Sequence, residues 1–269
     1  MRIGFLGAGK MAQALAKGFI KAGTSRGEMM MASCLPSDKH SVQAFEALGS
    51  KVVFTNEAVA EYGNILIISV KPQVVPIVLE KLQNVNQLVI SLAMGISLSY
   101  LETKLPRGTP VIRVMPNTPA SIGFAASVFV RGNHANDKHV ETVKNMFSTI
   151  GICQQIDDES LMDTVTALAG SGPAYVYMMI EALADGAVNM GMPRQLAYQL
   201  ASQTVIGAGM MVKESGHHPA QLKDDVASPA GSTIAGIHHL ETHGMRSAII
   251  GAIQAATLRC AKTSETKKF

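Results

Sequence analysis

The sequence contains no tryptophan, few cysteines and little excess charge of either sign. Its three cysteines are odd in number and far apart, which argues against a disulfide framework and for a reducing compartment. The formal net charge is +3 and no basic block is longer than a pair of lysines, so we expect neither nucleic acid nor an anionic membrane as a partner. The most apolar long segment, residues 175–190, carries Glu181 and Asp185, which argues against a membrane span.

Patterns typical of metal sites and of nucleophilic enzymes are missing as well. His238 and His239 are neighbours that face different sides of a helix, without an acidic or cysteine partner at ligand spacing. No Gly-x-Ser-x-Gly turn occurs. We therefore expect no metal, and we expect a bound organic cofactor to carry the chemistry. Because the chain becomes apolar within two residues of Met1, it leaves no room for a leader sequence, and we expect a cytoplasmic location.

A glycine-rich turn between a strand and a helix is the first positive signal, at residues 7–12. It reads Gly-Ala-Gly-Lys-Met-Ala, the spacing that binds a dinucleotide pyrophosphate at a helix N-terminus. Gly7 permits the tight turn, Gly9 lets the pyrophosphate approach the backbone, and Ala12 lets helix and strand pack closely. The pattern predicts a dinucleotide site.

The second strand predicts which dinucleotide binds. Its end is the usual place for a carboxylate that binds the ribose 2'-hydroxyl, and here that place holds Ser33 and Cys34. Lys39 and His40 follow, so NADP(H) is favoured. NAD(H) stays an alternative because Asp38 is close by.

The strand pattern continues through the first half of the chain. We expect strands at residues 2–6, 29–32, 52–55, 65–70, 88–93 and 111–114, edge strands at 125–130 and 153–156, and a helix at 138–150. Ligands of open α/β sheets bind at the carboxyl ends of the strands, where Lys71 and Asn117 stand. Either residue alone could be an ordinary loop lysine or turn asparagine, but their shared edge favours function.

From residue 161 to residue 262 we find only helical periodicity, with helices ending near 167 and spanning 174–190, 194–214 and 246–262. These apolar helices have more surface of the buried type than one small domain can hide, which predicts dimerisation. The expected fold is an α/β dinucleotide-binding domain at 1–157 and an all-α dimerisation and substrate-binding domain at 158–269.

The most informative stretch is residues 223–241. Small and hydroxylated residues, Ser228 to Thr233, lead directly into an apolar run at helical spacing. The free amides of a helix N-terminus can hold a carboxylate or phosphate. The alternative is that Ser232 or Thr233 merely caps the helix.

With these motifs in place, the chain resembles the pyrroline-5-carboxylate reductase family over essentially its whole length. The resemblance rests on residues 5–12, 70–72, 115–119, 170–175 and 225–233, of which the last is the most specific. It implies a Rossmann domain followed by a helical domain that interlocks with a partner subunit, as a homodimer or a higher oligomer such as a decamer. It also implies reduction of 1-pyrroline-5-carboxylate to L-proline by NAD(P)H, the last step of proline biosynthesis.

The resemblance also implies the site residues. Contacts to the dinucleotide are expected from Leu6, Gly7, Ala8, Gly9, Lys10, Met11, Ser33, Cys34, Asn56, Val70, Lys71, Pro72 and Asn117. Contacts to the substrate are expected from Ser171, Ser228, Gly231, Ser232 and Thr233. The Thr233 hydroxyl is the expected catalytic group, because it can hydrogen-bond the ring nitrogen.

This chain departs from the family pattern at Cys34 and Ala169, where serine is usual, and at Ala230, where glycine is common. Two other functions stay open. A β-hydroxyacid or sugar-acid dehydrogenase would need a lysine between residues 174 and 190, and none is there. A nucleotide-sensing protein without turnover would not need the hydroxyls of residues 228–233.

Overall fold

The computed structural model describes the backbone of residues 1–265 and the side chains of residues 1–262. It divides into two compact units, one formed by Met1–Pro173 with the chain from Ala255, and the other by Ala174–Gln254. The boundary expected between residues 157 and 158 falls just after the last strand, which ends at Gln155. The segment that follows this boundary nevertheless packs on the sheet, where Met162 is buried in the core.

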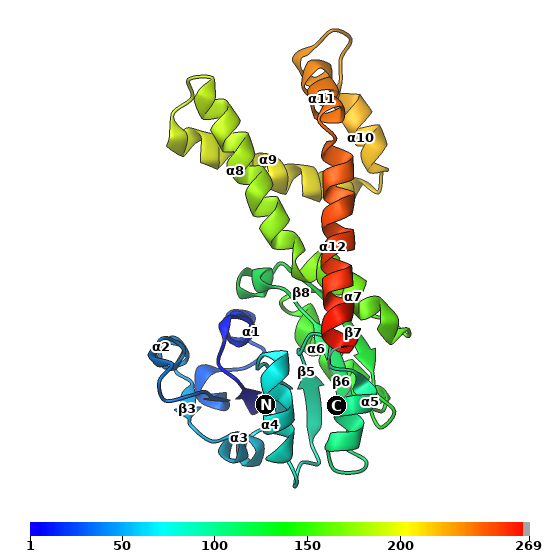
Figure 1. The fold of residues 1–269 in the computed structure, drawn as a ribbon. Helices are drawn as coiled ribbons and strands as arrows, with labels where there is room; N and C mark the ends of the chain where they lie inside the picture. Colours follow the sequence, from blue (N-terminus) through cyan, green and yellow to red (C-terminus); the bar gives the residue numbers. More distant parts are fainter. Residues whose placement is uncertain (266–269) are drawn as a thin grey trace. The chain divides into compact units, whose positions relative to one another are not determined.

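A parallel sheet lies at the centre of the first unit (Figure 1). Its strands are β1 (Ile3–Leu6), β2 (Met30–Ser33), β3 (Lys51–Val53), β4 (Ile65–Ile68), β5 (Leu88–Ser91), β6 (Val111–Met115), β7 (Ala125–Arg131) and β8 (Gly151–Gln155). Their order is β3-β2-β1-β4-β5-β6-β7-β8. All pairs are parallel except β6 with β7. The expectation that residues 125–130 form an edge strand is wrong, because β7 pairs with β6 on one side and β8 on the other.

Helices cover both faces of the sheet because strand residues alternate between two apolar clusters. One cluster joins Ile3 and Phe5 to apolar side chains of α1 (Lys10–Lys21), α2 (Lys39–Glu46) and α6 (Asp137–Ser148). The other joins Leu6 and Ile68 to side chains of α3 (Asn56–Tyr62), α4 (Val75–Glu80) and α5 (Leu98–Lys104). Short 3-10 turns occur at η1 (Gly27–Met29), η2 (Pro72–Val74), η3 (Thr118–Ile122) and η4 (Glu159–Leu161). After η4 come α7 (Met162–Val165) and a π-helical turn, η5 (Thr166–Gly170).

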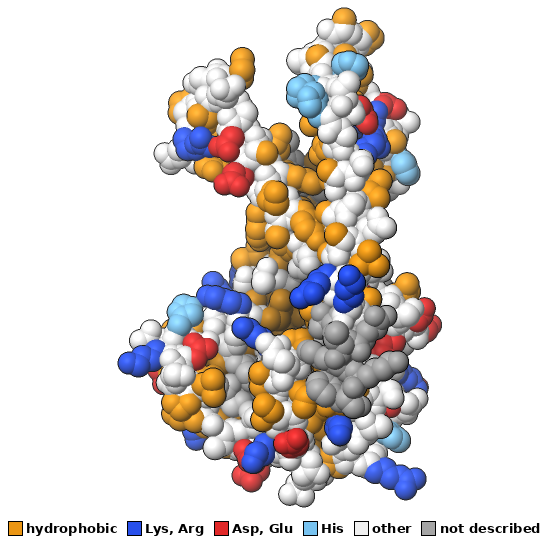
Figure 2. All heavy atoms as spheres, in the orientation of Figure 1, with side chains coloured by type: hydrophobic (Ala, Val, Ile, Leu, Met, Phe, Trp, Pro, Cys, Tyr) orange, Lys and Arg blue, Asp and Glu red, His pale blue; other side chains and the backbone are white. Residues whose placement is uncertain are grey.

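The second half is helical, as expected from its periodicity. Its helices are α8 (Gly172–Asn189), α9 (Arg194–Ser215), α10 (Pro219–Val226), α11 (Ser232–Thr242) and α12 (Met245–Glu265). Many large apolar side chains on these helices are exposed, among them Met178, Leu183, Ile206, Met211 and Ile250. Figure 2 shows hydrophobic side chains along the surface of the helical segments. None of the described helices is long and apolar enough to cross a membrane. Such an exposed apolar surface is typical of a chain that buries it against another protein.

Candidate active site

The strand order reverses beside β1, whose neighbours are β2 on one side and β4 on the other. Where the order of an open α/β sheet reverses, connections leave in opposite directions and open a crevice at the carboxyl ends of the strands. The glycine turn follows β1 directly and leads into α1, so it lies at this crevice. The fold therefore places the predicted dinucleotide motif where such sheets bind ligands.

The glycine turn has the geometry that its sequence predicts. Gly7 has φ +108, and a Cβ at this position would lie 2.7 Å from a Val70 methyl carbon. The Ser69 hydroxyl donates to the Gly7 carbonyl at 2.7 Å and so ties the turn to the end of β4. A Cβ on Gly9 would meet nothing within 4 Å, so its backbone borders open space. Gly9 is the N-cap of α1 and supplies no side-chain cap, which leaves the first amides of the helix free for an anion.

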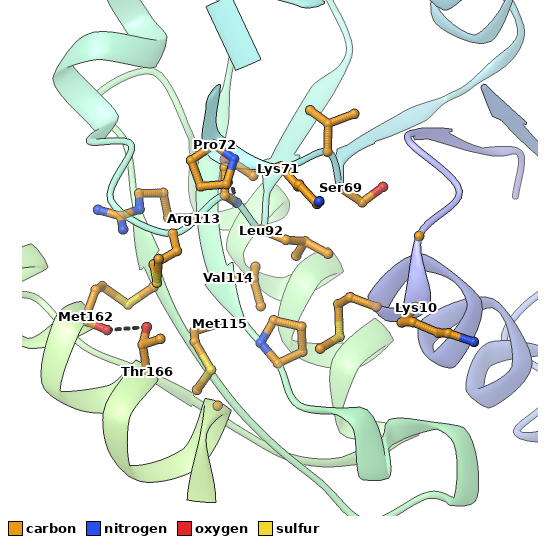
Figure 3. A pocket seen from close by; sticks show the side chains of 18 of the residues that line it. Lys10, Ser69, Lys71, Pro72, Leu92, Arg113, Val114, Met115, Met162 and Thr166 are labelled. Carbon is orange, nitrogen blue, oxygen red and sulfur yellow. Dashed lines mark hydrogen bonds between the residues drawn. The ribbon is translucent and has the colours of Figure 1, made fainter. Parts of the chain in front are cut away.

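A cavity of about 540 Å³ extends from this turn along the ends of β4, β5 and β6. Figure 3 shows Lys10 at one end of the cavity and Arg113 with Met162 at the other. Its lining combines the glycine turn with the ends of these strands and with residues of α7, η5 and Ser171: Gly9, Lys10, Met11, Ser69, Val70, Lys71, Pro72, Ser91, Leu92, Ala93, Met94, Arg113, Val114, Met115, Pro116, Met162, Thr166, Gly170 and Ser171. The volume and the free helix amides fit an extended nucleotide cofactor.

Arg113 is a buried charge at the far end of the cavity, with its side chain 9% exposed. It forms an ion pair with Glu159, and the same carboxylate oxygen accepts a hydrogen bond from the Leu98 amide at 2.8 Å. Burial raises the pKa of the Asp163 carboxyl, while the positive charge of Arg113 acts in the opposite direction. This cluster holds η4 and the start of α5 against β6.

The sequence predicts that groups at and after the end of β2 select between NADP(H) and NAD(H). The Ser33 hydroxyl donates to Asn56 Oδ1 at 2.6 Å. Lys10 Nζ lies 2.9 Å from His40 Nε2. The Asp38 carboxylate caps α2 by accepting from the Ser41 amide at 3.1 Å, and hydrogen bonding by Ser41 holds the pKa of Asp38 below its usual value.

The three cysteines are partly or fully buried and form no disulfide. Burial, helped by the Asp38 carboxylate, raises the pKa of Cys34. Burial raises the pKa of Cys153 to about 11. The buried Cys260 thiol donates to the sulfur of Met94 at 3.5 Å. Within the described residues, no group of three or more histidine, cysteine or acidic side chains could hold a metal ion.

Asn117 has its side chain engaged by backbone groups. Its Oδ1 accepts from the Ala126 amide at 3.0 Å, and its Nδ2 donates to the Ala169 carbonyl at 3.0 Å. It is 6% exposed and does not line the cavity.

Residues 228–233 belong to the second compact unit. Ser228 to Gly231 form a turn closed by a bond from the Gly231 amide to the Ser228 carbonyl at 3.1 Å. Ala230 has φ 56, the only positive φ of a non-glycine residue among the described ones. A Cβ on Gly231 would lie 2.4 Å from the Ser228 hydroxyl oxygen, so a larger residue here would require the Ser228 side chain to move.

The N-cap of α11 is Gly231, without a side-chain cap bond. The expectation of a loop that leads into a helix N-terminus is therefore confirmed, whereas the alternative of Ser232 or Thr233 as the cap is wrong. Both hydroxyl residues lie in the first turn of the helix. The amides of this turn and the Thr233 hydroxyl have no acceptor or donor among the described residues.

The cavity brings together seven of the residues expected from the sequence: Gly9, Lys10, Met11, Val70, Lys71, Pro72 and Ser171. Leu6, Gly7, Ala8, Ser33, Cys34, Asn56 and Asn117 lie outside its lining. Sequence reasoning missed Arg113, Met162 and Thr166. Arg113 had a signal in the sequence, because it is a charged residue within the apolar strand at 111–114. Nothing in the sequence indicates that Met162 and Thr166 lie at the sheet edge.

Comparison with known proteins gives a consistent result along the whole chain. Residues 159–263 match the family model for pyrroline-5-carboxylate reductase dimerisation, and residues 2–95 match the model described as NADP oxidoreductase coenzyme F420-dependent. The pyrroline-5-carboxylate reductase of Pisum sativum is 45% identical over 266 residues, which cover 97% of this chain and 96% of the relative. Pyrroline-5-carboxylate reductase 3 of Rattus norvegicus is 42% identical over 267 residues, which cover 98% and 96%.

A solved structure supports the same assignment. The crystal structure of Plasmodium falciparum pyrroline carboxylate reductase with NADP bound is 30% identical, with a TM-score of 0.89 and coverage of 98% of each chain. At this identity and coverage, the chain belongs to the pyrroline-5-carboxylate reductase family.

Proposed function

We propose that this protein reduces 1-pyrroline-5-carboxylate to L-proline with NAD(P)H, the final step of proline biosynthesis. The observation that carries the proposal is a nucleotide-sized cavity at the sheet's switch point, in a chain that matches reductases of this name over nearly its whole length. The alternative of a β-hydroxyacid dehydrogenase lacks its lysine, because α8 contains none.

The cofactor site consists of the glycine turn and the ends of β2 and β4. The amides at the start of α1 bind the pyrophosphate, because they are free and Gly9 borders open space. Leu6 to Met11 and Val70 to Pro72 surround the dinucleotide, while Ser33, Cys34 and Asn56 lie toward its adenosine ribose. NADP(H) is preferred and NAD(H) is accepted more weakly, because Lys10 and His40 can meet a 2'-phosphate and the nearby Asp38 carboxylate is already engaged as a helix cap.

The substrate site uses neutral groups. The amides from Gly231 to Thr233 bind the substrate carboxylate at the N-terminus of α11, with Ser171, Ser228 and Ser232 as further polar contacts. The Thr233 hydroxyl hydrogen-bonds the ring nitrogen and orients the C=N bond.

The chemistry needs little acid–base assistance from the protein. When bound, NAD(P)H supplies the hydride that adds to the carbon of the C=N bond. The electron pair of that bond moves to nitrogen, whose proton is already present in the iminium form of the imine. The residues of the site thus act mainly through proximity and orientation.

The functional unit is a homodimer built through the second half of the chain, and a larger oligomer such as a decamer would be assembled from it. Support comes from the match of residues 159–263 to a dimerisation family and from the exposed apolar side chains of these helices. We place the protein in the cytoplasm, in keeping with its three free cysteines.

The test measures NAD(P)H oxidation against a panel of cyclic imines and 2-oxo acids, and NAD(P)+ reduction against 3-hydroxy acids, with both cofactors. We expect turnover with 1-pyrroline-5-carboxylate, formation of proline, and a higher kcat/KM with NADPH than with NADH. Turnover with hydroxy acids and none with the imine would contradict the proposal.

A further inference from the structure

Asn117 joins three separate parts of the first unit. It follows β6 in the chain, accepts a hydrogen bond from Ala126 at the start of β7, and donates one to Ala169 in η5. The two partners fix the orientation of the amide, since a backbone carbonyl can only accept and a backbone N–H can only donate. Because both ends of the side-chain amide are used at 3.0 Å, this buried side chain is held in one place.

The carbonyl that Asn117 meets has lost its usual helical partner. In an α-helix the Ala169 carbonyl would accept from the N–H of residue 173, but that residue is Pro173 and has no N–H. A half-buried carbonyl without a partner is costly, and the Asn117 amide supplies the missing donor. Asn117 thus stabilises the chain where α7 passes through the π-helical turn into α8.

The turn that Asn117 holds forms one wall of the cavity. Thr166, Gly170 and Ser171 all line it. The π-helical bond from the Ser171 amide to the Thr166 carbonyl measures 2.8 Å. The turn is also closely packed against β6, because a Cβ on Gly170 would lie 3.1 Å from the sulfur of Met115. A small displacement of η5 would therefore change the shape of the cavity.

We propose that Asn117 is a positioning residue, which fixes η5 so that Thr166, Gly170 and Ser171 present a set surface to the cavity. This gives Asn117 an indirect role in place of the direct cofactor contact expected from the sequence. The inference rests on the proposed function, because this wall includes Ser171, which the proposed function assigns to the substrate.

The test compares three variants with the wild-type protein. Asn117→Asp keeps the size of the side chain and the acceptor for Ala126, but replaces the donor to Ala169 by an oxygen. Gly170→Ala displaces the same turn without touching Asn117. Ser121→Ala is the matched control, because it removes another hydrogen bond of η3, from the Ser121 hydroxyl to the Thr118 carbonyl, which does not involve η5. For each variant we would measure the Kd for NADPH by calorimetry, the kcat and KM for the imine at saturating NADPH, and Tm.

We expect Asn117→Asp to lower kcat/KM for the imine by roughly 5- to 100-fold, the usual effect of losing one buried hydrogen bond near a reacting centre. The Kd for NADPH should stay within about twofold of wild type, Gly170→Ala should shift kcat/KM in the same direction, and Ser121→Ala should change neither. A Kd for NADPH that rises in step with the loss of kcat/KM would mean direct cofactor contact and overturn the proposal. A lower Tm with wild-type kinetics would overturn it as well.

Failure of this inference differs from failure of the proposed function. If the wild-type protein does not reduce the imine, the proposed function is wrong. If the wild-type protein does and Asn117→Asp retains full kcat/KM, only the role of Asn117 is wrong.

Discussion

Thr233 offers a direct test of the substrate loop, because its helix is capped by Gly231 and does not need the threonine hydroxyl. Thr233→Val keeps the shape of the side chain and removes one hydrogen-bonding group. We expect kcat/KM for the imine to fall by roughly 5- to 100-fold, with little change in Tm.

A matched control lies in the same helix. The Thr242 hydroxyl donates to the His238 carbonyl of the same helix at 2.7 Å. Thr242→Val therefore removes a hydroxyl that bonds only within α11. It should leave kcat/KM at the wild-type value. Full turnover by Thr233→Val would remove Thr233 from the mechanism.

Ala230 carries a backbone conformation that costs stability. Its φ of 56 is left-handed, which disfavours an L residue with a Cβ by roughly 1–2 kcal/mol. Ala230→Gly should therefore raise the free energy of unfolding by about 1 kcal/mol in urea titrations. Ala235→Gly, in the interior of α11, should lower it by about 0.5–1 kcal/mol. Equal destabilisation by both substitutions would show that the turn is not strained.

The link between β6 and η4 depends on a buried ion pair. Arg113→Met leaves Glu159, whose side chain is 30% exposed, without its partner. Breaking a buried pair costs roughly 3–5 kcal/mol, and the partial exposure of Glu159 favours the lower end. Removing both charges with Arg113→Met and Glu159→Gln should recover part of the loss.

An exposed pair serves as the control for Arg113. Asp137 is 97% exposed in its pair with Arg131, so Arg131→Met should cost less than about 1 kcal/mol. Urea unfolding of all four proteins gives the comparison. A cost for Arg113→Met no greater than that for Arg131→Met would show that the Arg113 pair does not hold η4.

The strands could be predicted because each is a short apolar run. The glycine turn could be predicted because pyrophosphate binding sets the spacing of its glycines. Two other elements, η5 and α10, could not be predicted from the sequence. The π-helical turn η5 depends on the bond from Asn117 to Ala169, across 52 residues of sequence. Helix α10 has no buried residue and hence no apolar stripe; its one sequence signal is Pro219 in the first turn, where the fixed φ of proline suits a helix.

The cavity lining could be predicted where a residue directly follows a predicted strand or begins a predicted helix. It could not be predicted where packing between distant segments brings a residue to the cavity. Lys71 and Met11 line the cavity, and their position could be predicted because they stand beside a strand end and a helix start. Arg113 was missed because its role depends on Glu159, which follows a different strand. The end of α12 belongs to the first unit, where Cys260 contacts Met94, and this packing has no signal in the sequence.

The assembly of the molecule can be tested on α8. Met178 is 69% exposed and Leu183 52% exposed in the single chain. A Met178→Asp, Leu183→Asp double substitution places two charges on this surface. If it is the subunit interface, the dimer Kd in sedimentation should rise by roughly 30-fold or more, which corresponds to about 2 kcal/mol.

Ile77, 59% exposed on α4 of the first unit, gives a matched control. Ile77→Asp should leave the sedimentation of the protein unchanged. A wild-type chain that is active and monomeric at assay concentration would rule out the dimer as the functional unit.

Isotope transfer tests the central claim, hydride transfer to an imine carbon, most directly. NADPH deuterated at C4, in separate 4R and 4S forms, would be incubated with the protein and 1-pyrroline-5-carboxylate, and the product analysed by mass spectrometry. Because a fixed cavity holds the nicotinamide with one face toward the substrate, we predict proline with one deuterium at C5 from one of the two forms and unlabelled proline from the other. Oxidation of NADPH without deuterated proline from either form would contradict the account.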